Sequence, residues 1–122
     1  MSGVQKLVID GREVLMVDYS DCNQEAMIVL ATQLCELALT ENKDSLVLNI
    51  FNNKSFITPK VMRHFEDVTN QTIHLIDKMA IVGLSPTKKV ILKGYNLLFK
   101  RDFKAFDTQE EAIAYLMDNN KT

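Results

Sequence analysis

Two strand-length apolar runs, each followed by a Ser/Thr-Pro pair, are the strongest constraint on the fold of this 122-residue chain. Residues 45–51 and 78–84 are nearly continuous apolar runs, which is typical of central strands covered on both faces. Thr58 and Ser85, each followed by proline, then combine a helix N-cap with proline at the first helical position. Strands that alternate with helices need crossover connections, so this pattern predicts a largely parallel sheet.

The first pair of strands is predicted to be antiparallel, which makes the sheet mixed. Asp10 and Gly11 favour a tight hairpin, because glycine adopts positive φ without steric cost. The predicted elements, in chain order, are strands at 4–9 and 13–18, a helix at 23–40, a strand at 45–51, a helix from 59, a strand at 78–84, a helix at 86–99, a strand at 103–106 and a helix after 108. The fold class is therefore α/β, with a mixed, mostly parallel five-stranded sheet and helices on both faces.

Composition fits one domain over residues 1–122 and argues against several functional classes. The net charge is −2, so no basic field indicates nucleic-acid binding. Cys22 and Cys35 form no CxxC pair, and with only two histidines in the chain they make no metal pattern, so neither a metal nor another cofactor is expected. Without a signal-peptide pattern or a run of about 20 apolar residues, the protein is expected to be cytoplasmic with no transmembrane segment.

The sequence contains no recognisable set of catalytic residues. Nucleophilic catalysis needs a base beside the nucleophile, and the sequence brings neither histidine near Cys22, which we interpret as a loop residue. Gly83 precedes a helix, but one glycine is not a phosphate-binding loop. We therefore predict that the protein is not an enzyme, and an enzyme that uses Cys22 or Asp18 is the least favoured alternative.

Asp18, Ser20 and Thr58 form a candidate loop site. Asp18 ends the second predicted strand, where the carboxyl ends of parallel strands often bind ligands. Local roles explain the same residues, because Asp18 can cap the following turn and Thr58 the following helix.

The predicted helix at 86–99 carries the clearest functional signal. Seven basic residues and one acid, Asp102, lie between positions 78 and 104. Leu92, Tyr95 and Phe99 recur at helical spacing, and a second apolar stripe is formed by Val90, Ile91, Gly94 and Leu98. One stripe must face the sheet, and the other would face a neighbouring helix, a partner or a lipid tail.

We predict that Leu92, Tyr95 and Phe99 contact a second subunit, a partner or a ligand. Lys88 and Lys89 would steer an anionic partner or headgroup towards them. A basic helix face that is simply solvated explains the same charge pattern.

Several segments resemble the small stand-alone bacterial STAS-like proteins, which are related to anti-sigma-factor antagonists and, more distantly, to CRAL-TRIO lipid-transfer domains. The similar segments are Val-Asp-Tyr-Ser at 17–20, Phe-Ile-Thr-Pro at 56–59, Ala-Ile-Val-Gly-Leu at 80–84 with the lysine-rich helix after it, Phe-Asp-Thr-Gln-Glu-Glu-Ala at 106–112, and Tyr-Leu at 115–116. The resemblance implies a STAS-like fold and a regulatory or ligand-binding role. Antagonists of that family carry a phosphorylatable serine in an Asp-Ser-Ser-Gly-like turn, whereas the matching segment 56–61 has no Asp-Ser pair. Pro59 stands near the phosphoacceptor position and Thr58 is the nearest hydroxyl, so Thr58 is expected to cap a helix rather than accept phosphate.

The combined prediction is a non-enzymatic regulatory or protein-interaction module that binds a protein partner or forms a homodimer. The alternative is a carrier of a small lipid or anionic ligand. A pocket among the helices would favour the carrier, whereas a flat exposed apolar patch would favour the interaction module.

Overall fold

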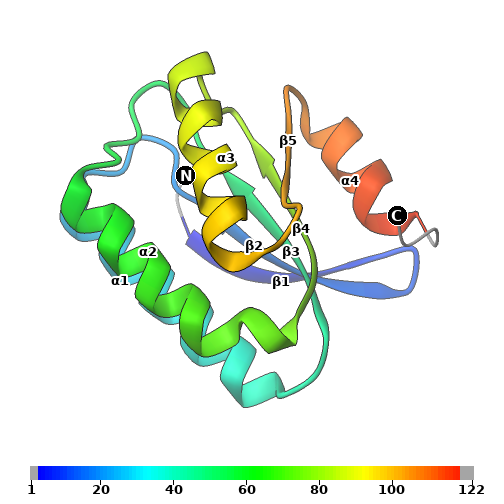
Figure 1. The fold of residues 1–122 in the computed structure, drawn as a ribbon. Helices are drawn as coiled ribbons and strands as arrows, with labels where there is room; N and C mark the ends of the chain where they lie inside the picture. Colours follow the sequence, from blue (N-terminus) through cyan, green and yellow to red (C-terminus); the bar gives the residue numbers. More distant parts are fainter. Residues whose placement is uncertain (1–2, 119–122) are drawn as a thin grey trace.

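The structure is a computed structural model that describes residues 3–118 (Figure 1). Its elements, in chain order, are β1 (Gly3–Ile9), β2 (Arg12–Asp18), α1 (Gln24–Glu41), β3 (Ser45–Ile50), α2 (Pro59–Thr72), a 3₁₀ turn (Ile73–Leu75), β4 (Ile76–Val82), α3 (Pro86–Phe99), β5 (Lys104–Phe106) and α4 (Gln109–Met117). The five strands form one sheet in the order β1-β2-β3-β4-β5. β1 pairs with β2 antiparallel, and every other pair is parallel. The predicted α/β fold class is therefore confirmed.

Local side-chain chemistry starts the helices where the sequence predicts. The hydroxyls of Thr58, Ser85 and Thr108 each accept a hydrogen bond from a backbone N–H in the first turn of α2, α3 and α4. In the β1–β2 hairpin, Asp10 and Gly11 both have positive φ, at 49° and 78°, as a two-residue type I′ turn requires.

All five strands differ from their predicted bounds, by two residues at each end of β4 and by one residue in each of β1, β2, β3 and β5. β4 runs from Ile76 to Val82 and not from 78 to 84, because Gly83 turns the chain out of the strand with φ of 89°. β5 begins at Lys104 and not at Phe103. The Phe103 amide donates to Asn96 Oδ1 at 3.0 Å, so it does not form a hydrogen bond with the neighbouring strand.

Helices cover both faces of the sheet, but unequally (Figure 1). Each new strand of this sheet is added at the same edge, because the strand order follows the chain. Right-handed crossovers then place every connecting helix on the same face. The three connecting helices α1, α2 and α3 accordingly pack over one apolar cluster, which includes Leu15, Val17 and Val47. α4 connects no strands and packs over the other face, where Ala112 and Leu116 join Val14, Leu46, Leu48, Ile50, Ala80 and Val82 in a second cluster.

Candidate functional site

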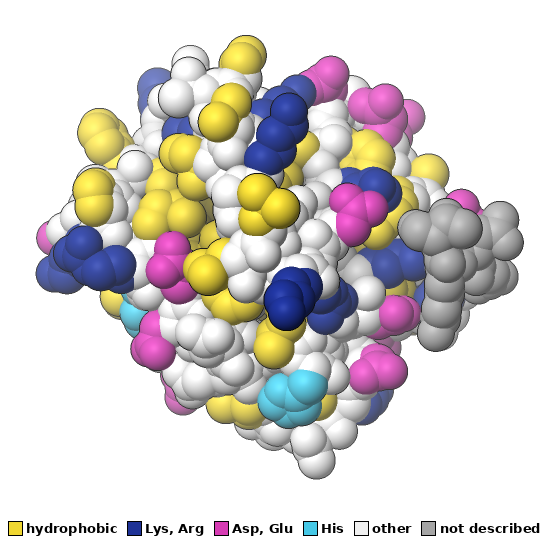
Figure 2. All heavy atoms as spheres, in the orientation of Figure 1, with side chains coloured by type: hydrophobic (Ala, Val, Ile, Leu, Met, Phe, Trp, Pro, Cys, Tyr) yellow, Lys and Arg dark blue, Asp and Glu magenta, His cyan; other side chains and the backbone are white. Residues whose placement is uncertain are grey.

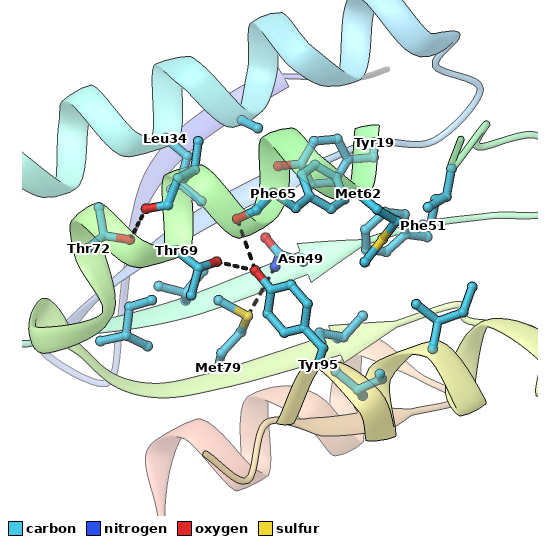
Figure 3. Close-up of a pocket in the computed structure, with 18 of the residues that line it drawn as sticks. Tyr19, Leu34, Asn49, Phe51, Met62, Phe65, Thr69, Thr72, Met79 and Tyr95 are labelled. Atoms are coloured by element: carbon cyan, nitrogen blue, oxygen red, sulfur yellow. Dashed lines mark hydrogen bonds between the residues drawn. The ribbon is translucent and has the colours of Figure 1, made fainter. Parts of the chain in front are cut away.

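A cavity of about 100 Å³ lies on the three-helix face, between α1, α2 and α3 and the strands below them (Figure 3). Apolar side chains make most of its wall. Its lining residues are Tyr19, Ala31, Leu34, Cys35, Ala38, Val47, Asn49, Phe51, Ile57, Met62, Phe65, Val68, Thr69, Thr72, Ile76, Met79, Ile81, Leu84, Lys88, Ile91, Leu92 and Tyr95. In the space-filling view, hydrophobic side chains are visible in the hollow between α3 and the beginning of α2 (Figure 2).

The cavity exists because α3 is attached at its ends and stands away from the sheet along its length. No residue of α3 is buried, in contrast to α1, α2 and α4. Near its beginning, Lys88 Nζ donates to the Ser55 carbonyl at 2.9 Å. Further along, the Tyr95 hydroxyl donates to the Phe65 carbonyl at 3.0 Å and also hydrogen-bonds with Thr69 of α2. Leu92, between these two attachments, lies over the cavity.

The segment after α3 is fixed by hydrogen bonds to backbone groups. Asn96 donates to the Phe103 carbonyl and accepts from the Phe103 amide, both at 3.0 Å. The Arg101 guanidinium donates to the Ile73 and Ile76 carbonyls at 3.0 and 2.5 Å. These bonds hold the end of α3 against the start of β4.

The cavity is almost free of charge. Burial raises the pKa of the Tyr95 hydroxyl to about 12, although the hydrogen bond with Thr69 lowers it, and burial also raises the pKa of Tyr19 well above its usual range. Burial likewise raises the pKa of the Cys35 thiol. Both phenols and the thiol are therefore neutral near pH 7, and Lys88 is the one charged side chain among the described residues of the lining.

Asn49 of β3 is the most unusual polar residue in this wall. Its Nδ2 donates to the Met79 sulfur at 3.3 Å, and its Oδ1 is buried without a hydrogen-bond partner among the described residues (Figure 3). A buried amide normally finds stronger partners than a thioether. Sequence reasoning missed Asn49. The available signal was a polar residue two positions after Val47 in an otherwise apolar strand, which places both side chains on the same face.

The structure brings part of the predicted α3 site together. Lys88, Leu92 and Tyr95 line the cavity, whereas Phe99 packs its ring against Tyr95 with centroids 4.8 Å apart. Lys89 pairs with Asp107 at 3.3 Å and does not line the cavity. Contact of these five residues with a ligand or partner stays a prediction.

The second stripe of α3 is the one that faces outward. Its members Val90, Ile91 and Leu98 are exposed, although Ile91 also lines the cavity. Leu97, which was not part of the predicted stripe, lies beside it and is 81% exposed. Yellow side chains along α3 in Figure 2 mark this surface. The inward stripe thus packs within its own chain, and an apolar surface remains on the opposite side of the same helix.

The basic segment does not form one continuous surface. Lys78 is buried, where its ammonium donates to the Tyr115 carbonyl at 3.0 Å and lies over the Tyr115 ring. Arg101 is occupied by the carbonyls described above, and Lys104 pairs with Asp102 at 2.8 Å. Several of these cations therefore stabilise the fold locally, and the cluster in the sequence does not correspond to a single binding field.

In the candidate loop site, Asp18 and Thr58 are occupied by hydrogen bonds within the chain. Asp18 Oδ1 accepts from the Ser20 amide at 2.9 Å, which caps the turn after β2. Thr58 accepts from the Val61 amide at 3.2 Å as the N-cap of α2 and donates to Gln24 Oε1 at 2.6 Å. None of the three predicted loop residues lines the cavity.

The neighbouring loops are also tightly packed. Ser55 is buried, and its hydroxyl donates to the Tyr19 carbonyl at 2.8 Å. Cys22 lies in a loop and is buried as well, and the Phe56 amide donates to its carbonyl at 3.1 Å.

Metal-binding clusters and membrane-spanning helices are both absent from the described part of the chain. Residues 3–118 contain no group of three or more His, Cys, Asp or Glu side chains arranged to hold a metal ion. None of the helices in this range is long and apolar enough to cross a membrane.

Comparisons with known proteins yield a structural match only. No family model matches the sequence, and no curated protein matches it significantly. Among solved structures, the chain is similar to an uncharacterized protein of the DUF3478 family from Shewanella loihica PV-4, which is described as having a SpoIIAA-like fold. The two share 14% sequence identity, the match covers 95% of each chain, and the TM-score is 0.65. The sheet order, the helices on its two faces and this match together show that the chain has the SpoIIAA-like fold, the fold of the STAS-like proteins that its sequence resembles.

Proposed function

We propose that this protein is a non-enzymatic binding module that holds a small, mainly apolar molecule in the cavity beneath α3. The cavity itself is the observation that carries the proposal. An apolar cavity of about 150 Å³ in another protein stays dry and binds benzene. The present cavity, at about 100 Å³, is smaller but equally apolar, so it suits a molecule of about one ring.

The lining chemistry supports binding rather than catalysis. Among residues 3–118, no histidine or carboxylate lines the cavity, so the usual general bases are absent from its described wall. Cys35 is the one thiol in that lining, and burial raises its pKa, which makes it a poor nucleophile. The neutral phenols and the apolar wall instead favour a molecule that leaves water for a hydrophobic site.

Methionine methyl groups give a direct test of ligand binding. With ¹³C-methyl-labelled methionine and toluene as the probe, we expect the resonances of Met62 and Met79 to shift, because both side chains line the cavity. Met16 and Met117 belong to the cluster under α4 and should stay unchanged. They are internal controls for non-specific solvent effects.

A matched pair of variants locates the site. Leu92→Phe places extra volume in the cavity and should weaken toluene binding about tenfold, since overpacking costs on the order of 1–3 kcal/mol. Leu97→Phe makes the same change on the outer face of α3 and should bind like the parent. If Met62 and Met79 do not respond to saturating toluene in the parent protein, the proposal fails.

A second candidate function is protein interaction, and the outer face of α3 favours it. Val90, Leu97 and Leu98 are each more than 60% exposed, and Gly94 lies among them with open space where a side chain would be. A second copy of the chain could bring its own α3 close along this face and form a homodimer.

Sedimentation equilibrium tests the homodimer. The parent should be dimeric at micromolar concentration, and Leu97→Ser with Leu98→Ser should give a folded monomer. Val29→Ser is the control, because Val29 is an exposed apolar residue on α1. A monomeric parent, or a double variant that stays dimeric, would exclude this surface as the dimer interface.

A further inference from the structure

The side chain of Asn49 lacks strong hydrogen-bond partners on the cavity wall. An asparagine amide has two N–H donors and one carbonyl acceptor with two lone pairs. Here one N–H donates to the Met79 sulfur, and the carbonyl oxygen accepts no hydrogen bond from the described residues. Turning the amide by 180° would place the carbonyl oxygen against the Met79 sulfur, which has no hydrogen to donate, and would leave the N–H groups without an acceptor. In either orientation, a polar group is buried without a partner, which destabilises the protein.

The neighbouring polar groups do not compensate for this cost. The Tyr95 hydroxyl donates to the Phe65 carbonyl and is also hydrogen-bonded with Thr69. Thr72 donates to the Val68 carbonyl at 2.9 Å, within its own helix. These two hydroxyls are therefore occupied. The Tyr19 hydroxyl on the same lining makes no hydrogen bond with the described residues, but the buried side-chain atom without a partner is Asn49 Oδ1.

From this geometry we infer that Asn49 recognises a small, uncharged, mainly apolar ligand that carries one hydroxyl group. The inference rests on the proposed function and specifies the ligand class. A hydroxyl both donates and accepts, so it can satisfy Asn49 in either amide orientation. A carboxylate has no proton to give to Oδ1, and it would lose its hydration on entering a mainly apolar cavity. Lys88 is the one cation of the lining that could offset this cost, and its ammonium already donates to the Ser55 carbonyl at 2.9 Å.

Phenol and toluene form a matched pair of probes for this inference. They have the same shape, and a hydroxyl in phenol replaces the methyl group of toluene. Dissociation constants come from the Met62 and Met79 methyl shifts in the parent protein and in Asn49→Leu. The ratio of phenol affinity to toluene affinity should fall about tenfold in Asn49→Leu, because one hydrogen bond to a buried amide is lost. Because this ratio is compared between the parent and the variant, the different solubilities of the two probes in water cancel. A third probe, benzoate, should bind to the parent more weakly than phenol does.

Stability without ligand gives an independent measurement. Asn49→Leu removes an unsatisfied amide, so the urea midpoint of the free protein should rise by about 0.5 M. Asn49→Val, with a smaller side chain suited to a strand, repeats both measurements if Asn49→Leu does not fold.

The outcomes separate this inference from the proposed function. If both probes bind and their affinity ratio is the same in the parent and the variants, Asn49 does not select the ligand, although the cavity still binds. A urea midpoint that falls in both variants would mean that water already satisfies Asn49, which also overturns the inference. Tighter binding of benzoate than of phenol would overturn the uncharged class. If no probe binds, the proposed function itself fails.

Discussion

Replacing Gly83 with alanine is expected to destabilise the protein by roughly 3 kcal/mol or more, because two separate penalties act at this position. Gly83 has φ of 89°, a conformation that L-residues with a side chain rarely adopt. A Cβ built there would lie 1.9 Å from the Phe51 carbonyl oxygen, which belongs to the backbone and cannot rotate away. The chain at this point leaves β4 and must pass the end of β3 before α3 begins, so relief of the clash would displace the start of α3.

Urea unfolding followed by circular dichroism measures this effect. Gly94→Ala is the matched control, since Gly94 lies within α3 and a Cβ added to it would meet nothing within 4 Å. This control should stabilise the protein by about 0.5–1 kcal/mol through helix propensity. If Gly83→Ala unfolds at the same urea concentration as the parent, the close approach of Gly83 to Phe51 is not present in solution.

Replacing Leu116 with alanine should cost about 3 kcal/mol, within the range of about 2–5 kcal/mol for a leucine removed from a core. Leu116 is fully buried, and it belongs to the one described helix that covers the second face of the sheet. No other helix within residues 3–118 packs on this face to fill the space, so the resulting cavity should collapse poorly. Val29→Ala is the control, because Val29 is an exposed residue of α1 and its truncation should change the free energy of unfolding by less than about 0.5 kcal/mol. Equal urea midpoints for the two variants would contradict the packing of α4.

The elements of this fold were predictable because local chemistry determines them. Thr58 and Ser85 cap their helices through contacts three residues away, and Asp10 with Gly11 closes the hairpin within two residues. Strand boundaries were less accurate where a distant group intervenes. The Asn96 side chain accepts the hydrogen bond of the Phe103 amide, so Phe103 does not pair with the neighbouring strand. The pattern of apolar residues within the strand does not predict that contact.

The candidate site was only partly predictable. The two stripes of α3 were visible in the sequence, but the sequence does not say which stripe faces inward or that the helix stands off the sheet. That distance depends on Tyr95 reaching the Phe65 carbonyl in α2, a contact across 30 positions of sequence. Asn49 was visible as a polar residue in an apolar strand, but its missing partner becomes apparent only when Met79 and the neighbouring helices are in place.

The sequential strand order has a consequence for how the chain folds during synthesis. Each parallel strand pairs with the strand made just before it, so the sheet can grow from its amino-terminal hairpin as the chain leaves the ribosome. α1, α2 and α3 arrive between the strands and can cover one face as it forms. α4 is made after all five strands, and until it emerges the apolar side chains of Val14, Leu46 and Leu48 have no helix over them. The nascent chain therefore exposes this apolar face in the interval between the synthesis of β5 and that of α4, when it is most prone to aggregate.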